Sequence, residues 1–215
     1  MLLRLPGVYR PQHDTQLLAG VLAAERLGPH SRVLDLCAGT GALSVAAAAA
    51  GAGRVTAVDV SRRAAISIRL NALARGHRIR VIHGDLTEHV RQERFELVVS
   101  NPPYVPASVD TVPDRGPARA WDAGKNGRAL LDRICCQAPD LLVDGGVLLL
   151  AQSGLSGVEK TLTMLEEQNM TVDVAATAEI PFGPVLVERR EMLERRGLIE
   201  VGQILEEIVV IRAVS

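Results

Sequence analysis

Short apolar runs alternate along the chain with longer segments whose apolar residues recur at helical spacing. After Asp14, for example, Leu17, Leu18, Val21 and Leu22 fall on one helix face, and Asp14 is placed to cap that helix. The pattern predicts strands at residues 32–37, 54–60, 78–83, 95–100, 145–153, 171–176 and 207–213. It predicts helices at residues 17–27, 42–50, 61–75, 87–92, 127–142, 157–168 and 188–197, with Pro139 as a break.

This alternation predicts an α/β fold, a Rossmann-like doubly wound seven-stranded sheet that is mostly parallel with one antiparallel strand. The sequence favours a single domain over residues 1–215. It has an N-terminal helical element at 1–30 and an insertion at 181–205 before the last strand. Ligands of such sheets bind at the carboxyl ends of the strands, so chemistry is expected there.

Composition narrows the function classes. The net charge of the 215 residues is -1 and aromatic residues make up 2%, so neither bulk electrostatics nor base stacking favours nucleic acid as the main partner. Cys37, Cys135 and Cys136 form no disulfide framework, and no histidines join them at metal-ligand spacing, so we expect no metal site. We expect a cytoplasmic protein without membrane contact, because no signal peptide or spanning segment is evident.

Chemistry-bearing residues follow the first three predicted strands. Gly39 and Gly41 form a turn that lets the backbone approach a ligand, although a tight strand–helix turn alone also explains them. Asp59 ends the second strand, where a carboxylate can accept from two ribose hydroxyls. Asp85 could accept from an adenine amine and Leu86 could flank the ring, while an ordinary turn aspartate is the alternative.

The fourth predicted strand ends in Asn101, Pro102, Pro103 and Tyr104. Prolines fix their backbone angles and leave no N–H to satisfy, so this loop is stiff. It can aim carbonyl oxygens and the Asn101 amide away from the sheet. We interpret these four residues as the catalytic motif.

Together these strand ends resemble the class I S-adenosylmethionine-dependent methyltransferases. The NPPY motif resembles their amino-methylating branch, which acts on glutamine or adenine nitrogens. VYRPQHDT at residues 8–15 and WDAGKNGR at 121–128 resemble segments of the short release-factor glutamine-N5 methyltransferases. The resemblance spans about residues 8–152, and the position of Asp35 leaves no room for the N-terminal helical domain of the longer bacterial enzymes.

The resemblance implies S-adenosylmethionine as the cofactor, a release factor as the protein substrate, and a small zinc-binding activator protein as a further partner. The residues that it assigns to the cofactor are Thr15, Asp35, Cys37, Ala38, Gly39, Gly41, Asp59, Asp85, Leu86 and Asn101. Arg10 and His13 depart from the family, which commonly has acidic residues there. Alternative functions are adenine-N6 methylation of DNA or RNA, small-molecule N-methylation, and an inactive scaffold that binds a partner.

Two features stay open at this stage. Trp121 either lines a substrate groove or anchors the long loop, which we favour because large aromatics bury much surface. The insertion at 181–205 is expected to be a surface loop, although it could alter the groove or an oligomer contact. Its arginines are typical of a solvated helix face and could also touch RNA; they are Arg189, Arg190, Arg195 and Arg196.

Overall fold

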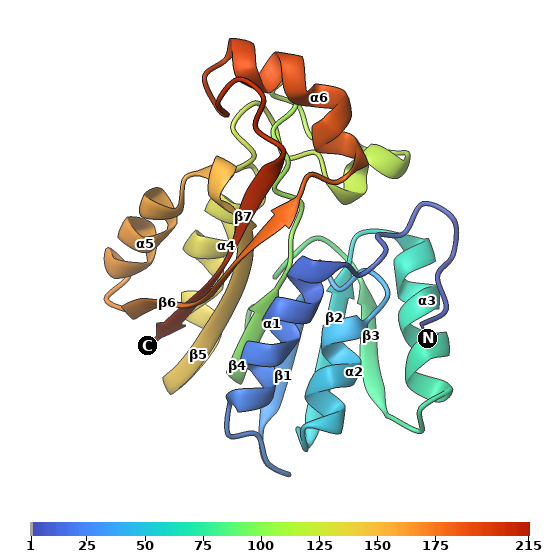
Figure 1. Ribbon diagram of the computed structural model, residues 1–215. Coiled ribbons are helices and arrows are strands. Elements are labelled where there is room, and N and C mark those ends of the chain that lie inside the picture. The colour runs from blue at the N-terminus through green and yellow to red at the C-terminus, as the bar shows by residue number, and fades with distance from the viewer. Residues whose placement is uncertain (1) are drawn as a thin grey trace.

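The computed structural model describes residues 2–215, and a single seven-stranded sheet runs through it in the order β3-β2-β1-β4-β5-β7-β6 (Figure 1). The strands are β1 (Arg32–Leu36), β2 (Arg54–Asp59), β3 (Ile79–His83), β4 (Phe95–Ser100), β5 (Leu142–Ser153), β6 (Thr171–Pro181) and β7 (Leu205–Val214). β1 to β5 pair in parallel, and β7 is antiparallel to both of its neighbours. The predicted fold class is confirmed.

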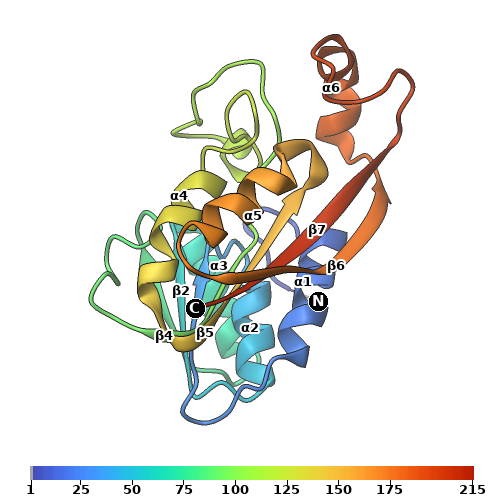
Figure 2. The ribbon, with the colours of Figure 1, turned by 90° about the vertical axis from the view of Figure 1, so that its left-hand side faces the viewer.

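Helices cover both faces of this sheet (Figures 1 and 2). The helices are α1 (His13–Ala24), α2 (Ala42–Ala49), α3 (Arg62–Leu73), α4 (Leu131–Gln137), α5 (Val158–Glu166) and α6 (Pro184–Arg195). α1, α2 and α3 pack on one face, α4 and α5 on the other, and α6 stands beyond the carboxyl ends of the parallel strands. Among residues 2–215, no helix has both the length and the apolar character that crossing a bilayer requires.

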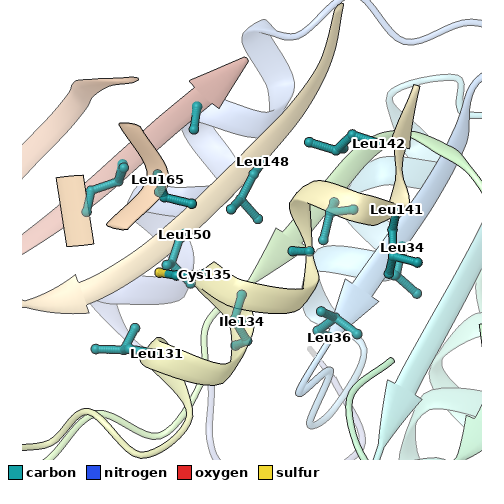
Figure 3. Packing of buried hydrophobic residues seen from close by; sticks show 14 of the residues in the cluster. Leu34, Leu36, Leu131, Ile134, Cys135, Leu141, Leu142, Leu148, Leu150 and Leu165 are labelled. Carbon is teal, nitrogen blue, oxygen red and sulfur yellow. The ribbon is translucent and has the colours of Figure 1, made fainter. Parts of the chain in front are cut away.

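The central strands are apolar on both faces because helices bury both faces. On β5, Leu148 and Leu150 belong to the core under α4 and α5, whereas Leu149 belongs to the core under α1 and α2. Figure 3 shows Leu148 and Leu150 of β5 near Ile134 and Cys135 of α4. All these side chains are fully buried, and each buried leucine contributes about 1.5–3 kcal/mol to folding.

The boundaries differ from the sequence prediction in several places. α1 begins at His13, so Gln12 holds the N-cap position without a side-chain capping bond, and Asp14 lies in the first turn, where its side chain accepts from Asn101. Residues 87–92 form turns and no helix, a stretch that begins just after Leu86 with its positive φ of 43°. The helix predicted over 127–142 shrinks to α4, since the positive φ of Gly127 delays its start and Pro139 ends it as expected.

The insertion predicted at 181–205 is more ordered than a surface loop. β6 runs on to Pro181, α6 follows, and β7 begins at Leu205. The backbone pairing of β6 with β7 continues up to Pro181, opposite Leu205. The segment is therefore a hairpin tipped by a helix, and its packing is described below.

Candidate active site

A cavity of about 440 Å³ opens at the carboxyl ends of β1, β2 and β4, within the size range of small-molecule sites. Its wall brings together most of the residues predicted from sequence: Thr15, Cys37, Ala38, Gly39, Asp59, Asp85, Leu86, Asn101, Pro102, Pro103 and Tyr104. Asp35 and Gly41 do not line it. The chain segments that meet here are far apart in sequence and share only the carboxyl edge of the sheet.

Asp59 fixes the glycine turn after β1. Its Oδ2 accepts from the Gly39 N–H at 2.8 Å, and its Oδ1 accepts from the Ser61 N–H at 2.7 Å. Burial raises the pKa of this carboxyl, against the lowering effect of those two hydrogen bonds. Each oxygen retains an unused lone pair, so Asp59 can accept two further donors from a ligand.

Asp35 supports the site from behind. It is fully buried, and its Oδ2 accepts from the backbone N–H and the hydroxyl of Ser44 in α2. Burial raises its pKa to about 7. Gly41 adopts a φ of +79°, and a Cβ there would lie 3.0 Å from the Ile68 side chain. These two residues therefore shape the strand–helix turn and do not touch the cavity.

The other predicted contacts are partly engaged with protein groups. Asp85 forms a 2.7 Å ion pair with Arg133, which also lines the cavity. Cys37 is half-buried with a positive φ of 57°, and burial raises the pKa of its thiol, so it is a neutral wall residue. Leu86 is buried and presents an apolar surface next to Asp85.

The Asn101 side chain has one end fixed and one end unpartnered. Its Nδ2 donates to Asp14 Oδ2 at 2.9 Å and to Thr15 Oγ1 at 3.2 Å. Its Oδ1 is buried and has no hydrogen-bond partner. A buried acceptor without a partner costs about 1–3 kcal/mol, which makes a ligand N–H or O–H a fitting complement.

Asp14 is the organising group that sequence reasoning missed. Its carboxylate, 3% exposed, accepts from five donors: the hydroxyls of Tyr9 and Tyr104, Asn101 Nδ2, and the N–H and hydroxyl of Thr15. Burial, with the nearby Asp14 charge, raises the pKa of both tyrosines, so they remain donors. The segment VYRPQHDT was the available signal, but the cap pattern assigned Asp14 to the helix.

A long loop forms the outer wall of the cavity. The Val105 N–H donates to the Trp121 carbonyl at 2.8 Å and the Ala107 N–H to the Gly124 carbonyl at 2.9 Å, so two limbs pair at the loop base. Trp121, half-buried, lines the cavity with other loop residues. Trp121 thus takes part in the backbone pairing at the loop base and also lines the cavity.

The segment after Trp121 is structural. Arg128, 4% exposed, donates to the carbonyls of Ser156 and Gly157 at 2.6 and 2.7 Å, ahead of α5. Gly127 has a φ of +71°, and a Cβ there would lie 2.3 Å from the Tyr104 carbonyl oxygen. This close approach allows the chain to pass directly behind the NPPY loop. Among residues 2–215, no three His, Cys, Asp or Glu side chains gather as a metal site.

Glu206 makes a testable contribution to stability. Its side chain on β7 is 8% exposed and accepts from Ser153 Oγ at 2.7 Å. Burial, together with the Asp14 charge, raises its pKa to about 7. An unfolded glutamate ionises near pH ~4.3, so between these values the folded state binds more protons and the free energy of unfolding falls as pH rises.

We expect Glu206→Gln to unfold at the same urea concentration as the parent near pH ~4, where both side chains are neutral. Near pH ~8 the variant should be more stable by up to about 3 kcal/mol, because it has no buried charge. Asp35 changes the pH dependence of stability equally in the parent and the variant, so the difference in stability between the two proteins reports on Glu206 alone. Equal stability of the two proteins at the higher pH would contradict the assignment.

Comparison with known proteins identifies the family of this chain. A family model described as "Methyltransferase small domain" matches residues 2–114. A Methanocaldococcus jannaschii protein, whose name places it among the protein N5-glutamine methyltransferases, is 34% identical over 182 residues, which cover 85% of this chain and 90% of that protein. The release factor glutamine methyltransferase of Geobacter sulfurreducens is 35% identical over 166 residues, and the match spans 74% of this chain but only 57% of that protein.

Among solved structures, the E. cuniculi Mtq2–Trm112 complex, described as responsible for methylation of the translation termination factor eRF1, superposes with a TM-score of 0.66. That match is 25% identical and covers 97% of this chain and 99% of the other. The family model alone covers more than half of the sequence. The chain belongs to the methyltransferase small domain family.

Proposed function

We propose that the protein transfers a methyl group from S-adenosylmethionine to the side-chain amide nitrogen of a glutamine in a translation release factor. The observation that carries this proposal is the Asn101 amide, with its nitrogen held by Asp14 and Thr15 and its oxygen unpartnered beside the cavity. A primary amide N–H is a donor of the required kind. The relatives named above as glutamine methyltransferases support the same acceptor.

The cavity residues fit S-adenosylmethionine. Asp59 has a free lone pair on each oxygen for the ribose hydroxyls, and the Gly39 turn lets the backbone approach closely. Leu86 would flank the adenine, and Asp85 would accept from its exocyclic amine through the oxygen not paired with Arg133. When bound, the cofactor supplies an electrophilic methyl group on its sulfonium.

The chain's own contribution is to orient a weak nucleophile. The lone pair of an amide nitrogen is delocalised into its carbonyl, so the nitrogen attacks poorly without help. Asn101 Oδ1 would accept one N–H and the Pro102 carbonyl the other, while the Tyr104 ring would pack on the amide plane. Orientation of this kind lowers a barrier by up to about 7–11 kcal/mol. The displaced proton passes to water after transfer.

A small partner protein is part of the proposal. The E. cuniculi Mtq2 structure is a complex with Trm112. By that likeness, and as the sequence resemblance implies, we propose that a small zinc-binding activator joins this chain. The near-neutral net charge of -1 favours a protein acceptor over DNA or RNA.

The proposal is tested by peptide mass spectrometry of a release factor that carries a Gly-Gly-Gln loop. The factor is incubated with the protein and S-adenosylmethionine, with and without cell extract as a source of activator. We expect a gain of one methyl on that glutamine. A matched factor with asparagine in place of the glutamine serves as the control and should gain none.

Cofactor binding is measured separately by calorimetry, so that an inactive preparation is recognised. If the cofactor binds and the glutamine stays unmodified even with extract, the proposed acceptor is wrong. Methylation of an adenine-containing oligonucleotide or of a small aromatic amine under the same conditions would then identify one of the alternative acceptors.

A further inference from the structure

The α6 hairpin packs on the cavity wall. α6 stands over the carboxyl edge of the sheet, at the end of β6 (Figures 1 and 2). Its buried residues Leu186 and Leu193 form a small apolar cluster with Ile199, and Val105 packs against that cluster. Val105 directly follows Tyr104 of the catalytic motif. The hairpin therefore rests on the residue where the wall loop begins.

Arg189 of α6 and Arg196, the C-cap residue that follows α6, reach the base of the wall loop. Arg189 forms a 2.7 Å ion pair with Asp122 and donates to the Pro106 carbonyl at 3.0 Å. Arg196 donates to the Ala107 carbonyl at 3.1 Å and to the Lys125 carbonyl at 2.7 Å. Pro106 and Ala107 lie in the outgoing limb of the loop, and Asp122 and Lys125 lie in the returning limb. Each arginine therefore ties both limbs together.

The part of the loop between these limbs borders the cavity. It contributes Val112, Pro113, Asp114, Gly116, Arg119, Ala120 and Trp121 to the wall. The direct backbone pairing between the limbs consists of only a few hydrogen bonds, at Val105 and Ala107. Three of the four arginine contacts are charge-assisted hydrogen bonds to backbone carbonyls, a class about twice as strong as neutral hydrogen bonds, and the fourth is the ion pair with Asp122.

We propose that Arg189 and Arg196 act as an arginine clasp, a pair of positioning residues that hold the wall loop in the shape that admits the methyl acceptor. The inference rests on the proposed function for the nature of that acceptor. The clasp touches the chain just after Tyr104, so it acts on the acceptor side of the cavity. Its loosening would cost acceptor binding most, with a smaller effect on the cofactor, because Arg119 of the same loop lines the cavity and its charge lowers the pKa of Asp59.

The same helix supplies a matched control. Arg190 is exposed, and Arg195 is exposed with its Nε bonded within α6 to the Glu191 carbonyl. The test compares Arg189→Met/Arg196→Met with Arg190→Met/Arg195→Met. Both pairs remove two positive charges from α6 and its C-cap, but only the first pair removes contacts to the loop.

We expect the clasp variant to raise the KM for the release factor by about tenfold with kcat and cofactor Kd within about threefold of the parent. Backbone amides of residues 105–125 should exchange hydrogen faster in the clasp variant. The control pair should match the parent in both measurements. A general loss of folding would lower kcat and cofactor affinity together, so the expected split identifies a positioning role.

The two readouts separate this inference from the proposed function. Unchanged hydrogen exchange in residues 105–125 overturns the clasp, whatever the acceptor is. Faster exchange with an unchanged KM overturns its role in acceptor binding. If the parent does not methylate a release factor, the proposed function fails, and the KM is then measured with whichever acceptor the parent methylates.

Discussion

Replacing Asn101 with alanine is expected to lower kcat by about 10²–10³-fold, the loss typical of removing one preorganised hydrogen-bonding group from a reacting centre. The variant loses the unpartnered Oδ1 that would fix the acceptor amide, while the Asp59 end of the cavity is untouched. Single-turnover transfer of a labelled methyl group gives kcat, and calorimetry gives the cofactor Kd, which should stay within about threefold.

The thermal midpoint of Asn101→Ala provides the control for folding. Truncation frees one acceptor position on Asp14, which keeps its other donors from Tyr9, Thr15 and Tyr104. We therefore expect a folded protein with an intact cavity. Activity within about tenfold of the parent would rule out the proposed role of Asn101.

Replacing Asp14 with alanine is expected to lower kcat by about 10²-fold, although Asp14 does not itself accept the substrate amide in this scheme. The change strips Asn101 Nδ2 of its closer acceptor and leaves Thr15 Oγ1 at 3.2 Å, so the amide can turn and lose its set direction. It also frees the Tyr104 hydroxyl. The rate of methyl transfer at saturating cofactor and acceptor measures the effect.

Asp14→Asn is the milder companion in case alanine disturbs folding. Asparagine keeps the shape of the side chain and one acceptor oxygen. Its NH₂ group, however, replaces a carboxylate oxygen that accepts hydrogen bonds, and it would face those donors without accepting from them. We therefore expect a loss of kcat smaller than that of Asp14→Ala. Asp144→Asn makes the same chemical change at an exposed position and should leave the rate unaltered.

A double-mutant cycle tests whether Asp14 acts through Asn101. If it does, Asp14→Asn/Asn101→Ala should be no slower than Asn101→Ala alone, because the group being oriented is already gone. If the two losses of kcat are additive, Asp14 acts on the reaction independently of Asn101. Tyr104 would then be the residue through which Asp14 acts.

The sheet was predictable because strand signals are local. Runs such as residues 95–100 are apolar on both faces and end in turn residues, so strand existence and the carboxyl-end location of the site followed from pattern alone. The lining residues Asp59, Asp85 and Asn101 were identified in the same way. Asp35 was assigned to the cofactor by resemblance, and the structure places it behind the strand–helix turn, outside the cavity wall.

What could not be predicted depends on contacts between distant segments. Asp14 sits beside an apolar helical stretch, where a cap is the usual role, and its partner Asn101 is 87 residues away. Arg189 and Arg196 are typical of a solvated helix face, and only the folded chain brings them to Asp122 and Lys125. The periodicity of the sequence does not predict such contacts between distant segments.

The position of β7 also has a consequence for biosynthesis. β7 lies between β5 and β6, and β6 has no other partner in the sheet. A nascent chain that has emerged only as far as residue 204 therefore presents an open edge on β5 and an unpaired β6, both prone to wrong pairing. β7 must therefore leave the ribosome before this half of the molecule can close, and a truncation that removes β7 would leave β6 without a partner strand.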